Sequence, residues 1–187
     1  MRRVKVRPGF LLLLAALFWL DEGVGFLLFG VIAAILHELG HYGAGRIFGQ
    51  RLKVLELSAV GAQMELAGVG VLSYLQEMCI TLAGPLVNLV CGWLSIQIGW
   101  FLFAGANLAL AGLNLLPVLP LDGGRTLWCA VTCLAGERWG DDVLTVLSAV
   151  SVGALAGAGA VAALRFANLS LLIVSGWLMW LTLVRKK

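Results

Sequence analysis

Charged residues are scarce in this chain. Of its 187 residues, 12% are charged and 61% are hydrophobic, whereas soluble globular domains have about 25% charged and about 45–50% apolar residues. This composition excludes an ordinary soluble domain. It indicates an integral membrane protein, because apolar runs long enough to span a bilayer recur along the sequence. We expect residues 1–187 to form a single membrane domain.

The few basic residues are concentrated at the two ends. Four lie within positions 2–7, before the first apolar run, and three lie within positions 185–187. The chain therefore lacks the basic domain surface that nucleic-acid binding requires. Because positive charges that flank spans stay in the cytoplasm, the sequence predicts a multi-pass protein of the plasma membrane. Both termini would be cytoplasmic, which requires an even number of spans.

The four cysteines all lie within apolar runs, at Cys79, Cys91, Cys129 and Cys133. In the bilayer or the cytoplasm we expect no disulfide bonds. Cys129 and Cys133 are one helical turn apart, a spacing that permits metal binding. We prefer the interpretation that they pack among apolar residues, as free cysteines commonly do.

The chain has only two histidines, His37 and His41, and both belong to the sequence HELGH. On a helix this HExxH spacing puts both imidazoles on one face, where they can bind zinc, with Glu38 as the general base. The motif follows the apolar run Val24–Leu36. At about 1.5 Å per residue, the histidines lie about 20 Å and about 26 Å into a span about 30 Å thick. Charge is costly at this depth, so a functional site is favoured over a chance match.

Two histidines do not complete a catalytic zinc site, which takes three protein ligands and a water molecule. The third ligand must be a carboxylate or a thiolate, because no third histidine exists. Asp122 follows Pro117 and Pro120, which break a span at the depth of His41. The alternative role for Asp122 is a helix N-cap. We favour the ligand role, because a charge at membrane depth is costly without a partner.

The apolar runs predict an all-α polytopic membrane protein with six transmembrane helices. The expected spans are residues 10–20, 24–49, 74–97, 99–116, 143–163 and 169–184, while the apolar stretch 126–135 is too short to cross.

Between the second and third spans, residues 51–66 alternate polar and apolar around Gly61. This alternation predicts a small membrane-associated β-hairpin, with a connecting loop as the alternative. Because a lone hairpin is marginally stable, we expect it to pack on the helices or to accept another strand. Its free edge is suited to binding an extended peptide.

Three motifs in this order make the chain resemble the site-2 protease family of intramembrane zinc metalloproteases. They are HELGH at 37–41, AGPLVN at 83–88 and the segment NLLPVLPLDG at 114–123.

The resemblance implies particular roles for residues of all three motifs. It implies that His37, His41 and Asp122 bind one Zn²⁺ ion per chain and that Glu38 activates water. It also implies that the substrate is a transmembrane or membrane-associated protein segment. Asn88 and Asn114 correspond to family positions suited to substrate positioning or transition-state stabilisation.

Within the family, the six-span plan looks most like the sporulation-type branch, the stage IV sporulation protein FB group. That branch cleaves a membrane-associated pro-sigma factor and usually carries a C-terminal nucleotide-sensing CBS domain. The sequence up to Lys187 contains no CBS domain and no inserted PDZ domain. A regulatory membrane partner is also among the expected interactions.

The sequence therefore predicts an intramembrane zinc endopeptidase that acts in regulated intramembrane proteolysis. Zinc-activated water would attack the peptide bond with Glu38 as the general base. Two alternatives stay open. A membrane metal carrier would use His37, His41 and Asp122 as a transport site without needing a base at Glu38. An inactive membrane scaffold would bind a partner membrane protein without cleaving it.

Overall fold

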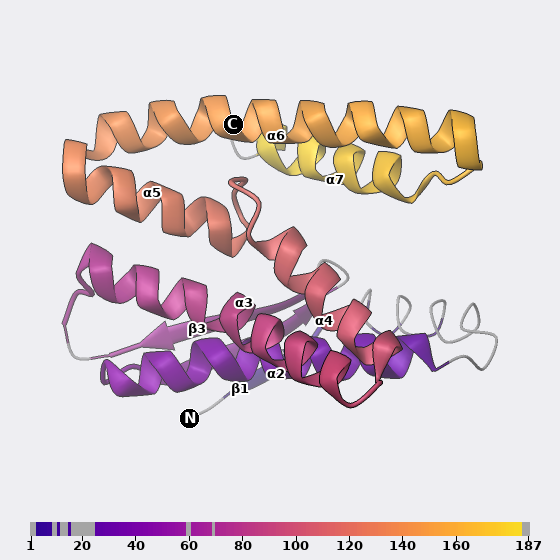
Figure 1. The fold of residues 1–187 in the computed structure, drawn as a ribbon. Coiled ribbons are helices and arrows are strands. Elements are labelled where there is room, and N and C mark those ends of the chain that lie inside the picture. The colour runs from indigo at the N-terminus through magenta and orange to yellow at the C-terminus, as the bar shows by residue number, and fades with distance from the viewer. Residues whose placement is uncertain are drawn as a thin grey trace. The chain divides into compact units, whose positions relative to one another are not determined.

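The structure is a computed structural model, and it describes residues 3–8, 11, 15, 25–58, 61–68 and 70–184 (Figure 1). Its elements, in chain order, are β1 (Arg3–Val6), α2 (Phe26–Ile47), β2 (Arg51–Ser58), β3 (Gly61–Ala67), α3 (Tyr74–Gln97), α4 (Phe101–Asn114), α5 (Asp122–Ala135), α6 (Glu137–Phe166) and α7 (Ser170–Val184). They fall into two compact units, Met1–Gly112 and Leu113–Lys187. The expectation of a single protease domain stays a prediction.

The described part of the chain contains three helices that are long and apolar enough to cross a bilayer. They are the Leu27–Ile47 part of α2, all of α3 and all of α6. Helices α4 and α7 are apolar but have only 14 and 15 residues, or about 21–23 Å at about 1.5 Å per residue. Of the predicted first span, only positions 11 and 15 are described. The fold is thus mostly helical, with three candidate spans, and the six-span count stays a prediction.

The observed helix ends agree with the predicted ends for α3 and differ from them for α6. Helix α3 covers the predicted residues 74–97, and Ser73 caps it in a capping box with Gln76. Helix α6 begins at Glu137, whereas the predicted span began at Val143. The polar residues before Val143 are thus the start of α6, where an acidic residue in the first turn is favourable.

The predicted hairpin is confirmed as the antiparallel pair β2 and β3. It has a third strand that was not predicted, because β1 pairs in parallel with β2 to give the sheet order β1-β2-β3. Residues whose positive charges predicted only a cytoplasmic terminus thus form part of the sheet. Arg7 makes an ion pair with Glu56 of β2. Since β1 covers the other side of β2, the outer strand of the hairpin is β3.

Helices α2 and α3 approach each other closely at glycine residues. A Cβ atom at Gly40 would lie 2.6 Å from the carbonyl oxygen of Ala83, so this crossing requires glycine. Small residues of this kind let membrane helices pack tightly in the absence of a hydrophobic driving force. Helix α4 joins them where the rings of Phe29 and Phe103 lie 5.8 Å apart. The two histidines therefore lie on a helix held by two neighbours.

The second unit anchors the proline-rich segment that precedes α5. Within this unit, α6 contacts both α5 and α7 (Figure 1). Val118 and Leu121 are buried against Val152 of α6 and Leu178 of α7. Ser148 also donates a hydrogen bond of 2.8 Å to the carbonyl oxygen of Pro117. These contacts fix the chain on the approach to α5.

Helix α5 begins at Asp122, four residues before the apolar stretch 126–135 that was expected to be too short to cross. Its N-cap is Leu121, which makes no side-chain capping bond. The alternative interpretation of Asp122 as the N-cap is therefore wrong, since Asp122 is itself the first helical residue. The start is tightly packed, because a Cβ atom at Gly124 would lie 2.5 Å from the backbone of Val118.

Candidate metal centre

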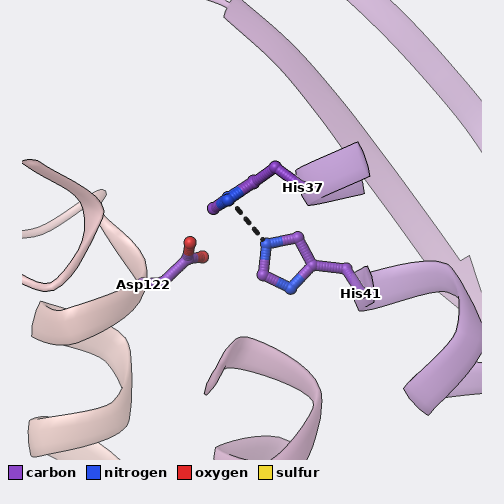
Figure 2. Close-up of side chains that lie close together, drawn as sticks. All are labelled: His37, His41 and Asp122. Carbon is purple, nitrogen blue, oxygen red and sulfur yellow. Dashed lines mark hydrogen bonds between the residues drawn. The ribbon is translucent and has the colours of Figure 1, made fainter. Parts of the chain in front are cut away.

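His37 and His41 lie one turn apart on α2, and their side chains meet. The ring centroids are 4.7 Å apart with an interplanar angle of 85°. Their Nε2 atoms are 3.1 Å apart (Figure 2). His37 is only 5% exposed. The spacing predicted from HELGH thus brings two ring nitrogens to one point.

Asn88 of α3 holds the opposite side of the His37 ring. Its Oδ1 atom lies 2.7 Å from His37 Nδ1, and its Nδ2 atom donates to the carbonyl oxygen of Ala33 at 2.9 Å. These bonds direct the amide oxygen toward the ring. Because a carbonyl oxygen accepts but never donates, His37 Nδ1 carries a hydrogen and donates it.

His41 is held in a similar way by the backbone of α3. Its Nδ1 atom lies 2.7 Å from the carbonyl oxygen of Ile80, so it too donates. Gly84 lies beside the ring, and a Cβ atom there would be 2.4 Å from His41 Nε2. A larger residue at position 84 would push the imidazole away from this place.

The two rings fit a zinc ion. In a neutral imidazole with a hydrogen on Nδ1, the lone pair is on Nε2. The two Nε2 atoms lie 3.1 Å apart, so their lone pairs can bind one cation together. Zinc–nitrogen distances of about 2.0–2.1 Å in a tetrahedral site place two ligand nitrogens about 3.3 Å apart. The outer hydrogen bonds from Nδ1 are the kind that orient histidine ligands of zinc.

The AGPLVN motif therefore has a structural explanation. Ile80, Gly84 and Asn88 are spaced by four residues, so they lie on one face of α3. That face meets the two histidines through the contacts described above. Asn88 is fully buried, and the partner of its Oδ1 atom is His37. The substrate-positioning role suggested by the resemblance stays a prediction for Asn88.

Two groups at this centre were missed by reasoning from the sequence. One is the Ile80 carbonyl, for which no sequence signal exists. The other is Asn107 of α4, which is fully buried and accepts a hydrogen bond from Asn88 Nδ2 at 2.9 Å. An asparagine in an apolar helix is costly without a partner. A search of the apolar runs for asparagine would therefore have found Asn107.

The other predicted site residues lie at defined places in the fold. Glu38 is partly buried on α2 between the two histidines in sequence, and Asn114 is the last residue of α4. Asp122 opens α5 in the second unit, and its side chain is drawn in Figure 2. Its role as a metal ligand is a proposal. All four cysteines are free thiols.

Comparison with known proteins finds two relatives by sequence and a similar solved structure. No family model matches the chain. Stage IV sporulation protein FB from Bacillus subtilis (strain 168) is 31% identical over 135 residues, which cover 67% of this chain and 46% of that protein. A zinc metalloprotease from Methanocaldococcus jannaschii is 30% identical over 111 residues, which cover 51% of this chain and 31% of that protein. The chain thus spans less than half the length of the curated relatives it matches.

A solved structure resembles the whole fold. The site-2 protease from Methanocaldococcus jannaschii aligns with a TM-score of 0.63 over 95% of this chain and 87% of that chain, at 20% sequence identity. At this identity the likeness is one of fold.

Proposed function

Because this chain belongs to the site-2 protease family, we propose that it is an intramembrane zinc endopeptidase. Its substrate would be a transmembrane or membrane-associated protein segment, as in regulated intramembrane proteolysis. The observation that carries the proposal is the pair of histidine Nε2 atoms 3.1 Å apart, with both Nδ1 atoms held by oxygen acceptors. Three apolar helices of spanning length support a site within the membrane. The enzyme would lie in the plasma membrane with both termini cytoplasmic.

Asp122 is the proposed third ligand of a single zinc ion. A catalytic zinc site takes three protein ligands, and the chain has no third histidine. Asp122 begins α5 directly after the anchored proline segment. A carboxylate held there supplies the negative charge that balances part of the charge of Zn²⁺ in an apolar setting.

Glu38 is the proposed general base. When bound, zinc lowers the pKa of a coordinated water molecule and polarises the scissile carbonyl. Glu38 would accept a proton from the attacking water and pass it to the leaving amine. Asn114, at the end of α4, is a proposed substrate-positioning residue. Water would enter from the cytoplasmic side, because the predicted second span returns to the cytoplasm and carries the two histidines near that end.

The outer edge of β3 is the proposed binding site for an unwound substrate strand. An extended peptide can add to an exposed sheet edge through main-chain hydrogen bonds, and β3 is the outer strand beside β2. We expect single proline substitutions along β3, between Ala62 and Leu66, to have effects on folding and cleavage that alternate from one position to the next. Positions whose N–H faces outward should keep the protein folded yet lose cleavage, because proline removes a donor.

Folding of each proline variant is checked by detergent-stable yield and helix content, and cleavage by the amount of product. Prolines whose N–H faces β2 serve as the matched set, since they should lower the yield as well. A complete scan that leaves cleavage unchanged in every folded variant would rule out this edge as the binding site.

Removal of metal is the general test of the proposed function. The purified full chain, reconstituted with a candidate membrane substrate, should produce a cleaved fragment that disappears after chelation and returns when zinc is added. Product formation in a zinc-free preparation would contradict the proposal. Failure of every candidate substrate, with zinc bound, would favour the inactive scaffold.

A further inference from the structure

We infer that Asn107 is a positioning residue for the metal ligand His37, and that it acts through Asn88. This inference rests on the proposed zinc site. Three hydrogen bonds connect the groups in series: His37 Nδ1 donates to Asn88 Oδ1 at 2.7 Å, Asn88 Nδ2 donates to Asn107 Oδ1 at 2.9 Å, and Asn107 Nδ2 donates to the carbonyl oxygen of Phe103 at 2.9 Å. The series crosses from α2 through α3 to α4.

Both asparagines are fully buried on apolar helices. An amide in such surroundings is unfavourable unless both its donor and its acceptor side find partners. Here each amide donates and accepts, so the pair is satisfied as a unit. A partly satisfied network would be worse than apolar residues in the same places. The complete series therefore indicates a role beyond packing.

The proposed role of Asn107 follows from the fact that a side-chain amide has an oxygen that accepts and an NH₂ group that donates. If the Asn88 amide were reversed, its NH₂ group would face His37 Nδ1 and would favour a lone pair on that nitrogen. The hydrogen would then move to Nε2, the atom that faces His41, and zinc binding there would be blocked. Two acceptors prevent the reversal, namely the Ala33 carbonyl and Asn107 Oδ1.

Of these two acceptors, Asn107 is the one that a substitution can remove. Its own orientation is set within α4 by the bond to Phe103. The identity of residue 107 thus determines how firmly the Asn88 oxygen is presented to His37. The effect reaches the metal ligand without any contact between Asn107 and the metal.

Substitutions in this series of hydrogen bonds should weaken zinc binding by different amounts. Loss of an outer-shell partner of a metal ligand typically weakens metal binding about 10–100-fold. We expect Asn88→Leu to fall in that range and Asn107→Leu near its lower end, because the Ala33 acceptor remains. The double variant should bind zinc no more weakly than Asn88→Leu, because Asn107 acts only through Asn88.

Asn107→Asp, as a neutral carboxyl group in these apolar surroundings, keeps both an oxygen acceptor for Asn88 and an O–H donor for the Phe103 carbonyl, so it should retain most of the affinity. Ser95→Ala is the matched control, since Ser95 is a buried polar residue of α3 whose hydroxyl donates to Cys91, outside the series. It should leave zinc affinity unchanged.

A second measurement uses the metal-free protein. The chain contains only two histidines, so ¹⁵N-histidine labelling gives a simple spectrum of the two rings at a pH that keeps them neutral. We expect His37 to carry its hydrogen on Nδ1 in the wild type, and Asn107→Leu to increase the population with the hydrogen on Nε2.

The outcomes separate this inference from the proposed function. If the wild type binds no zinc, the proposed function fails, while the ring tautomers still test the series. If the wild type binds zinc but Asn107→Leu changes neither affinity nor tautomer, the inference is overturned. Independent effects that multiply in the double variant would also overturn it, because Asn107 would then not act through Asn88.

Discussion

Glu38→Gln is expected to abolish cleavage while the protein keeps its zinc. The amide has nearly the same shape as the carboxylate but cannot accept the proton of the attacking water. Loss of a general base typically lowers a rate by about 10²–10⁴-fold, enough to remove visible product. Zinc should be retained because Glu38 is not one of the proposed ligands. The measurement pairs product formation with zinc content on the same preparation.

Glu137→Gln is the matched control for this substitution. Glu137 is exposed in the first turn of α6, so the same chemical change there should leave cleavage and zinc content as in the wild type. Product from Glu38→Gln at the wild-type rate would show that another group is the base. A metal carrier would keep moving metal after Glu38→Gln, which transport into vesicles would detect.

Asp122→Asn is expected to stop cleavage for a different reason, because the metal is lost. An amide oxygen is neutral and a weaker ligand than a carboxylate, so the site would hold Zn²⁺ much more weakly. We expect zinc affinity to fall by more than the about 100-fold limit seen for outer-shell partners. The loss should appear in a competition titration against a chelator of known affinity.

Asp142→Asn is the matched control for the third ligand. Asp142 is exposed on α6 of the same unit as Asp122. Its substitution removes an equal charge and should leave zinc affinity unchanged. Equal weakening by both substitutions would indicate a general effect of charge on the protein rather than loss of a ligand.

The site was most predictable where local geometry decides the outcome. The HELGH spacing places two histidines on one helical face whatever surrounds them, and the structure brings His37 and His41 together as expected. The scarcity of histidine then directs attention to a carboxylate. The bounds of α3 were predicted as well, from its apolar run, and a capping box of Ser73 and Gln76 marks its start in the structure.

Features that depend on distant partners were not predictable. Strand β1 is a four-residue segment whose partner lies about fifty positions further along the chain, and its basic residues indicated only a leader. The partners of Asn88 depend on how α2, α3 and α4 are rotated about their axes. That rotation is set by contacts such as Gly40 against Ala83, which no single stretch of sequence reveals.

The zinc content of the full chain is the decisive measurement for the proposed metal site. Wild type and Asp122→Asn would be purified in parallel, dialysed against the same chelator and analysed for metal per protein chain. We expect one zinc ion per wild-type chain and almost none in the variant. Stoichiometric zinc retained by Asp122→Asn would contradict the site formed by His37, His41 and Asp122.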